Sequence, residues 1–146
     1  MTTVFLDTNI IIDFLADRKP FSEDAARLFD LTLKGKLKIY VSALSYNNIY
    51  YILRQQFSHS ECLKMLITIN NWTEMLEASK EIVVAAMQSD FSDFEDAIQY
   101  FTAVSKSNIK CIVTRNTKHF KKSRLPVMTP GEMLKRYSLG GRGMRG

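Results

Sequence analysis

The sequence predicts a single α/β domain built on a central, mostly parallel sheet of about five strands. Short runs of β-branched and aromatic residues, typical of buried strands, alternate along the chain with longer segments of helical periodicity. This alternation is expected when helices cover a parallel sheet on both faces. The length of 146 residues suits one domain. We expect the domain to occupy residues 1–137, followed by a flexible, basic, Gly-rich tail at residues 138–146.

The first half of the chain contains two predicted strands and four predicted helices. They are a strand at 4–7, a helix at 9–16, a helix from Ser22 to Gly35, a strand at 38–41, a helix at 42–57 and a helix capped by Ser60. Ser22 is a suitable N-cap because acidic residues follow it in the first turn, and Gly35 is a natural helix stop. The helix after Ser60 is expected to bury Leu63, Leu66 and Ile67.

The second half continues the same alternation. Its predicted elements are a short strand at 72–76, a helix capped by Ser79, a helix at 92–105, a strand at 110–114, a strand at 126–128 and a helix beginning near Thr129. The proline that opens the strand at 126–128 favours an edge position. Thr129 and Glu132 have the spacing of a capping box, with Pro130 at the first helical position.

The composition is that of an ordinary globular protein. Apolar residues make up 46% and charged residues 24%, no apolar run approaches the roughly 20 residues of a membrane span, and the N-terminus lacks the features of a secretory signal. Cys62 and Cys111 are far apart in apolar surroundings. We therefore expect buried free thiols in a cytoplasmic protein, and neither a disulfide nor a zinc site.

The net charge of +5 favours a polyanionic partner. The excess positive charge is concentrated in residues 106–146, where the only acidic residue is Glu132. A solvated surface with a basic tail would explain this distribution. Beside an acidic metal site, a track for a phosphate backbone is the better interpretation.

Acidic residues occupy two places that this fold should bring together. Asp7 stands at the C-terminal end of the first predicted strand, at the sheet edge where open α/β folds bind ligands. Asp93 and Asp96 are three residues apart, which on a helix places them on one face, whereas Glu95 is expected to point elsewhere, toward solvent. Clustered carboxylates repel one another unless a cation intervenes, and their oxygens suit Mg²⁺ or Mn²⁺. Asp7 as a simple helix cap and Asp93 as a simple helix-start acid remain alternatives.

Three segments, in this order, resemble the PIN domain family. They are Val4-Phe5-Leu6-Asp7-Thr8-Asn9, then Asp93-Phe94-Glu95-Asp96-Ala97-Ile98-Gln99, then Ile112 to Phe120 followed by Pro126 to Pro130. The similarity extends from about Val4 to Tyr137. The family comprises metal-dependent ribonucleases, including the toxins of bacterial VapBC-type toxin–antitoxin pairs. The resemblance implies a PIN-like α/β/α sandwich, RNA as substrate, a Mg²⁺ or Mn²⁺ cofactor, a cognate antitoxin protein as partner and a homodimer.

The resemblance also implies residue roles. Asp7 and Asp96 match positions that hold metal in the family, and Asp93 matches the first acid of the D-x-x-D-A form, so all three are expected catalytic and metal-binding residues. Asn9 is expected to orient this acidic set. Asp13 also fits a family position, although a surface or capping role is the preferred interpretation.

Further roles follow from the segment after the strand at 110–114. Thr114 and Asn116 match the family's T-x-D/N pattern and are expected to support the site. Arg115 and Lys118 are expected to bind RNA phosphate. No Ser/His/Asp or Cys/His arrangement suggests a nucleophilic side chain, which a metal-activated water does not require.

Two departures from the family pattern concern charge. Many catalytic members carry a glutamate in the helix after the second strand, where this chain has Asn48, and the fourth acid is replaced by Asn116. An amide oxygen can coordinate Mg²⁺ but adds no negative charge. We therefore expect one firmly held metal, or metal bound only together with substrate, and weakened activity.

Two alternatives follow. A catalytically degenerate PIN domain that binds RNA or a protein without cleavage is consistent with Asn48 and Asn116. A phosphatase of the haloacid dehalogenase type also places an aspartate after a strand, but it requires a second aspartate two residues later. This chain has Asn9 there, so the phosphatase is disfavoured.

Overall fold

The computed structural model describes residues 1–143, with side chains described through residue 136. Within this range one sheet has the strand order β3-β2-β1-β4-β5, and every pairing is parallel. This confirms the predicted α/β class. Among the described residues, no helix has both the length and the apolar character needed to cross a bilayer. The strands are β1 (Thr2–Leu6), β2 (Leu37–Ser42), β3 (Glu74–Leu76), β4 (Cys111–Val113) and β5 (Val127–Met128).

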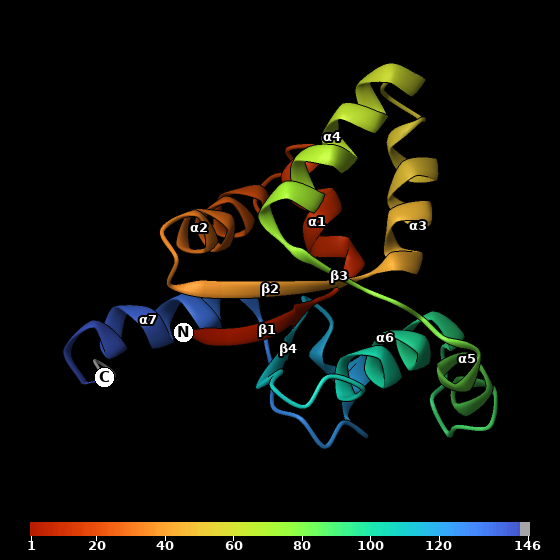
Figure 1. Cartoon of the computed structure of the whole chain (residues 1–146). Coiled ribbons are helices and arrows are strands. Elements are labelled where there is room, and N and C mark those ends of the chain that lie inside the picture. Colours follow the sequence, from red (N-terminus) through yellow and green to blue (C-terminus); the bar gives the residue numbers. More distant parts are fainter. Residues whose placement is uncertain (144–146) are drawn as a thin grey trace.

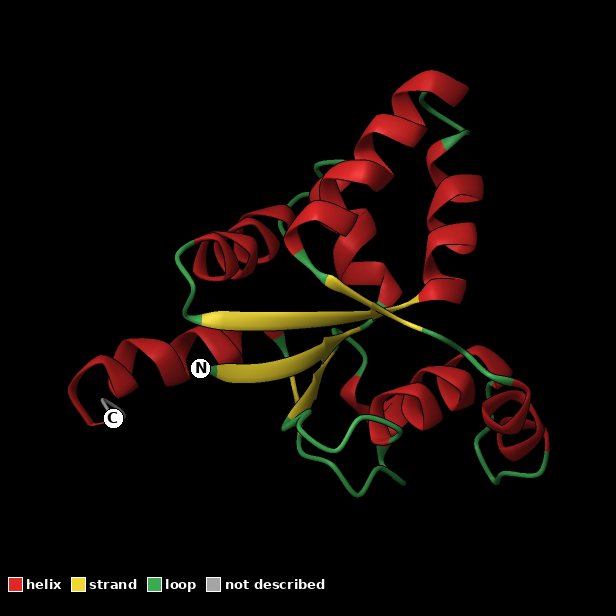
Figure 2. Cartoon of the chain, viewed as in Figure 1, coloured by secondary structure: helices red, strands yellow, loops and turns green. Residues whose placement is uncertain are grey.

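Helices cover both faces of this sheet (Figures 1 and 2). Above it in Figure 1 lie α1 (Thr8–Leu15), α2 (Ser22–Leu33), α3 (Ala43–Leu53) and α4 (His59–Trp72). Below it lie α5 (Lys80–Met87) and α6 (Phe94–Val104), while α7 (Pro130–Gly143) packs against α2 and β5. A short 3₁₀ helix, η1 (Thr117–Phe120), follows β4.

The central strand has no solvent-facing side. Val4 and Leu6 belong to the core cluster under α1 to α4, whereas Phe5 belongs to the cluster that includes residues of α6 and η1. All three side chains are fully buried because helices lie over both faces. The predicted buried strand at the start of the chain is thereby confirmed, and it contributes to both cores.

Parallel pairing brings three polar residues to one sheet edge. Asp7 follows β1, Ser42 ends β2 and Thr114 follows β4, while Leu6 is in register with Val113. The amide of Asp7 donates to the carbonyl of Val113 at 3.0 Å. The site described below is therefore anchored to the backbone of the two adjacent central strands.

Two predicted helix caps are wrong. Phe21 is the N-cap of α2, and the Ser22 hydroxyl instead donates to Asp17 at 2.8 Å. Ser58, not Ser60, caps α4 and forms a capping box with Glu61. A capping box needs a glutamate or glutamine three residues after the cap, and of these two serines only Ser58, with Glu61, has one.

The earlier start of α4 accompanies a different buried face from the one predicted. Leu63 and Ile67 are exposed, and the fully buried residues of this helix are Cys62 and Ile69. Leu66 packs at the border of the core. The apolar residues on the exposed face resemble core residues in sequence, because composition alone does not reveal which face meets the sheet.

Other local predictions are confirmed. Ser79 caps α5, Thr129 and Glu132 form the capping box of α7, and Gly35 ends its segment with a φ of +73°. Cys62 and Cys111 are free and buried. The backbone of α7 continues to Gly143, past the predicted start of the tail, and the remaining tail residues, 144–146, lie outside the described residues.

The core under α2 sets a stability test. Leu28→Ala removes a fully buried side chain and should lower the free energy of unfolding by about 2–5 kcal/mol because it leaves a cavity. Leu33→Ala, on the same helix but 59% exposed, is the matched control and should change it by less than about 0.5 kcal/mol. Urea denaturation followed by circular dichroism measures both; equal losses would contradict the burial described here.

Candidate active site

Asp7 is a buried carboxylate held by a hydrogen bond from a neighbouring strand. Only 5% of the residue is exposed, and its Oδ2 accepts from the Thr114 hydroxyl at 2.7 Å. Its backbone is at the N-cap of α1, but its side chain makes no capping hydrogen bond. Burial raises the pKa of Asp7, and the bond from Thr114 partly offsets that effect. Asp7 therefore occupies the N-cap position of α1, but its side chain does not cap the helix.

Asp96, in the first turn of α6, interacts electrostatically with Asp7. The pKa of Asp96 is raised to about 6, chiefly by burial and then by the negative charges of Asp93 and Asp7. An effect of the Asp7 charge on Asp96 requires the two carboxylates to lie near one another in a poorly solvated region. The tertiary fold thus brings together two acids that are 89 positions apart in the printed sequence.

Asp93 lies beside Asp96 but not on the same helix face. Its backbone is extended, at φ −128° and ψ 127°, and its Oδ1 accepts from the amide of Asp96 at 2.9 Å. Asp93 is therefore the N-cap of α6, so the predicted shared helix face is wrong. The capping bond occupies one of its two oxygens, and a metal-binding role for the other stays a prediction.

His119 is a site residue to which the sequence analysis assigned no role. Its Nδ1 lies 3.3 Å from Oδ2 of Asp96, and its proximity lowers the pKa of Asp96, against the larger effect of burial. His119 comes from η1, directly after the segment that carries Thr114. The sequence signal that could have pointed to His119 was its place in the third family-like segment, four residues beyond Arg115.

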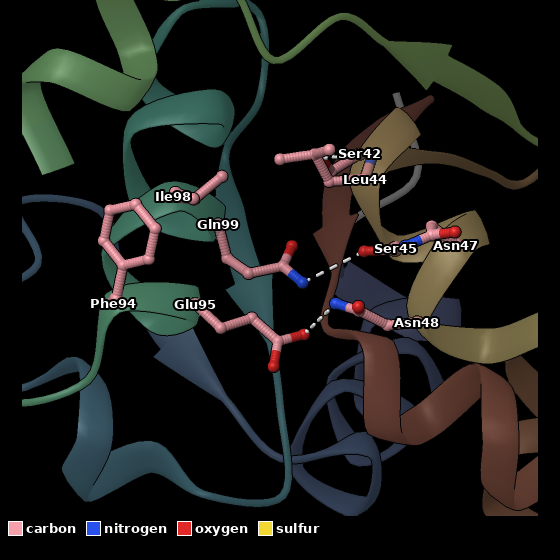
Figure 3. Close-up of a pocket in the computed structure, with 9 residues that line it drawn as sticks. All are labelled: Ser42, Leu44, Ser45, Asn47, Asn48, Phe94, Glu95, Ile98 and Gln99. Atoms are coloured by element: carbon pink, nitrogen blue, oxygen red, sulfur yellow. Dashed lines mark hydrogen bonds between the residues drawn. The ribbon is translucent and has the colours of Figure 1, made fainter. Parts of the chain in front are cut away.

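Glu95 is exposed to solvent, as expected, but its side chain reaches toward α3 and not away from the site. Its Oε2 accepts from Nδ2 of Asn48 at 2.7 Å across the gap between α6 and α3 (Figure 3). Its charge also raises the pKa values of Asp7 and Asp96, after larger effects that begin with burial. The position expected to carry a family glutamate, Asn48, therefore meets a carboxylate supplied by the opposite helix.

A buried polar cluster joins three helices immediately behind Asp7. Nε2 of Gln99 donates to the Thr8 hydroxyl at 2.5 Å and to the Ser45 hydroxyl at 3.0 Å, and the two hydroxyl oxygens lie 2.8 Å apart. These residues belong to α6, α1 and α3 respectively. The cluster holds the first turn of α1, and hence Asp7, against the helices that carry the other site residues.

Arg115 and Asp13 form a partly buried ion pair. Nε and a terminal nitrogen of Arg115 lie 2.6 and 3.2 Å from the two oxygens of Asp13, and the guanidinium stands 3.9 Å from the ring centre of Phe21. Asp13 is only 1% exposed, so its preferred interpretation as a surface or capping residue is wrong. The pair ties the loop after β4 to the end of α1. Phosphate binding by Arg115 stays a prediction, and Lys118 is the more exposed of the two cations.

The roles predicted for Asn9 and Asn116 differ in their structural support. The amide of Asn116 donates to the Thr114 hydroxyl at 3.0 Å, so its backbone helps to orient the group that holds Asp7. In the part of the chain that the structure describes, the Asn9 side chain is recorded in no hydrogen bond. Orientation of the acidic set therefore comes from Thr114 here.

The donor chemistry fits a hard divalent cation, although no complete ligand cage is preformed. The described residues contain no group of three His, Cys, Asp or Glu side chains already arranged to hold a metal. Buried Asp7 and partly buried Asp96 nevertheless offer carboxylate oxygens whose negative charge is destabilised by desolvation. A divalent ion would relieve that destabilisation, and water or substrate oxygens would complete its coordination.

Comparisons with known proteins agree with this geometry. The model for the PIN domain matches residues 3–118, so the chain belongs to the PIN domain family. Ribonuclease VapC1 of Aquifex aeolicus (strain VF5) is 26% identical over 140 residues, covering 92% of this chain and 95% of that protein.

Solved VapC-like structures share the fold. VapBC from Salmonella typhimurium, solved bound to DNA, gives a TM-score of 0.68 at 17% identity, covering 89% of this chain and 99% of that one. VapC20 from Mycobacterium tuberculosis, described as a Sarcin-Ricin loop cleaving toxin, gives 0.60 at 14% identity over 75% and 86% of the two chains. The predicted PIN-like architecture is confirmed.

The raised pKa of Asp96 sets a pH test in metal-free protein. Its folded pKa of about 6 lies above that of an unfolded aspartate, so its stabilising contribution is present below about pH 4 and is lost as pH rises through 6. The melting temperature of Asp96→Asn, minus that of the wild type, should therefore increase from pH 4.5 to pH 7 in EDTA. Differential scanning calorimetry measures it; a pH-independent difference would contradict the assigned burial.

Proposed function

We propose that this protein is a metal-dependent ribonuclease that hydrolyses RNA phosphodiester bonds, and that it is the toxin of a toxin–antitoxin pair. The observation that carries the proposal is that buried Asp7, at the carboxyl edge of a PIN fold, lies close enough to partly buried Asp96 to raise its pKa. The ribonuclease name of the Aquifex relative supports the activity. The VapBC complexes among the structural neighbours support the toxin role.

In the proposed site Asp7 and Asp96 hold Mg²⁺ or Mn²⁺, with Asp93 as a third ligand or a group adjacent to the ligands. The bound ion would lower the pKa of a water and stabilise negative charge on the phosphoryl oxygens. Thr114 fixes one oxygen of Asp7 by donating to it, which leaves the other for the ion. Asn116, in the loop after β4, supports this set by donating its amide to Thr114, and Asn9, in the first turn of α1, is a further proposed supporting residue.

The charge around the site suits an RNA backbone. Lys118 and His119 line a hollow of about 270 Å³ beside the start of α6, together with Lys121 and Lys122. This basic hollow borders Asp96, because Nδ1 of His119 lies 3.3 Å from Oδ2 of Asp96. We propose that Lys118 binds a phosphate there, and that any phosphate contact by Arg115 uses the guanidinium edge that Asp13 leaves free.

The partners follow from the same proposal. RNA is the substrate, a cognate antitoxin protein covers the acidic site, the protein forms a homodimer, and it acts in the cytoplasm. Because Asn48 and Asn116 add no negative charge, one metal is bound firmly and a second ion binds weakly or only with substrate.

A second candidate function is a PIN domain that binds RNA or a protein without cleaving RNA. The specific observation in its favour is that the described residues contain no preformed group of three metal-ligating side chains. RNA binding without Mn²⁺-stimulated cleavage products would favour this function over the nuclease.

The nuclease proposal predicts the loss of activity in two variants. Asp7→Asn and Asp96→Asn should each reduce Mn²⁺-dependent RNA cleavage at least about a hundredfold, because each removes a charge that holds the ion. Both should remain folded, since Asn retains an oxygen that can accept the bond from Thr114 in the case of Asp7. Asp30→Asn, which changes an exposed residue of α2, is the control. If either site variant cleaved RNA at the rate of the wild type, the proposal would be contradicted.

Asn48→Glu tests the proposed charge deficit. The new carboxylate would face Glu95 across the cavity, where Asn48 now donates a hydrogen bond, so it should tighten Mn²⁺ binding by about tenfold and lower the melting temperature in EDTA. Isothermal titration calorimetry measures the affinity. Gln55→Glu, which adds the same charge at an exposed position just after α3 that does not line the cavity, is the control, and an unchanged affinity in Asn48→Glu would mean that position 48 lies outside the metal site.

A further inference from the structure

A cavity of about 280 Å³ lies between α3 and α6, beside the acidic residues but not used by the proposed chemistry (Figure 3). Leu44 and Asn48 line it from α3, and Phe94, Glu95 and Ile98 line it from α6. Gln99 connects it to the acidic site, because it lines the cavity and donates to Thr8, the residue after Asp7. A group that enters this cavity is therefore held close to the proposed metal site.

The wall of the cavity contains a buried acceptor with no partner. Gln99 is 3% exposed and lines the cavity. Its Nε2 donates to Thr8 and Ser45, whereas its Oε1 has no hydrogen-bond partner among the described residues. An unpaired buried carbonyl is unfavourable, so a ligand N–H that reaches Oε1 gains a hydrogen bond that the free protein lacks.

The remaining lining offers a second acceptor and flat apolar surface. One oxygen of Glu95 accepts from Asn48, and the other is recorded in no hydrogen bond within the described residues. Ile98 is buried at the wall, while the Phe94 ring, 52% exposed, stands at the cavity with a free face. Acceptors beside an accessible aromatic ring are complementary to a planar ring that carries N–H donors.

We propose that this cavity binds one unpaired nucleobase of the RNA substrate, and that it selects a base with an exocyclic amino group. Adenine, cytosine and guanine each present an NH₂ group to Gln99 and Glu95, and Phe94 stacks on the base. Uracil is disfavoured because carbonyl oxygens flank its only ring N–H and face these acceptors. The inference rests on the proposed function, since it takes RNA as the ligand, and it identifies how that RNA is selected.

The test measures binding of four labelled hexaribonucleotides, which consist of uridines with A, C, G or U at one central position. Fluorescence anisotropy is recorded in Ca²⁺, with the integrity of each oligonucleotide checked on a gel. Wild-type protein should bind the A, C and G hexamers more tightly than the all-U hexamer. Phe94→Ala should weaken binding of the preferred hexamer about tenfold, and Gln99→Leu should remove the preference over uridine.

Two controls separate recognition from folding. Tyr51→Ala removes an exposed aromatic ring on α3 that does not line the cavity, and it should leave the preference unchanged. Gln99→Leu deletes two internal hydrogen bonds, so its melting curve is recorded. If it is unfolded, Phe94→Ala carries the test, because its ring is largely exposed.

The outcomes distinguish this inference from the nuclease proposal. Equal binding of all four hexamers by the wild type, or an unchanged preference in both variants, overturns the nucleobase site even if Mn²⁺-dependent cleavage is observed. A base preference lost in the variants supports the site even if the wild type cleaves no RNA, which would overturn only the nuclease proposal. If both variants weakened binding of a protein partner but left binding of the hexamers unchanged, the cavity would belong to that partner and the inference would be overturned.

Discussion

The carboxylate of Asp7 is held at the end of a strand that is covered on both faces, and this burial constrains the whole site. A charge in such a place is unfavourable unless something compensates it. The compensation at Asp7 is chiefly the hydrogen bond from Thr114, just after the neighbouring strand, with smaller contributions from the backbone of Thr8 and from His119. Thr114 is in turn oriented by the backbone of Asn116, while the next residue, Arg115, is anchored on buried Asp13. The loop after β4 therefore positions an acid that comes from the start of the chain.

The second wall of the site depends on contacts between helices. The Gln99, Thr8 and Ser45 cluster joins α6, α1 and α3 through buried hydrogen bonds. It fixes the separation of α3 and α6, and so leaves the cavity of Figure 3 open beside the acidic residues. A site for a metal ion and a site for a base would thus be built from the same three helices, with Glu95 at the border between them.

Local sequence signals predicted the fold well because they act over a few residues. Alternation of buried strands and amphipathic helices led to the parallel sheet, and the capping pattern of Thr129 and Glu132 correctly marked the start of α7. The same reasoning failed where two local patterns competed. The prediction of Ser60 as the cap of α4 missed the local pairing of Ser58 with Glu61, whereas Leu63 and Ile67 were expected inside because no local rule tells which apolar face of α4 meets the core.

The sequence by itself determined the chemistry available to this protein: the α/β order of elements, an aspartate after the first strand, a second acidic group before a late helix, and a family resemblance that joined them. Tertiary structure alone decided which of these groups meet. It turned Glu95 toward Asn48, set His119 beside Asp96, paired Arg115 with Asp13 and left Gln99 with an unpaired oxygen. The physical reason is that burial, ion pairing and hydrogen bonding between segments far apart in the chain depend on helix packing, which no short stretch of sequence encodes.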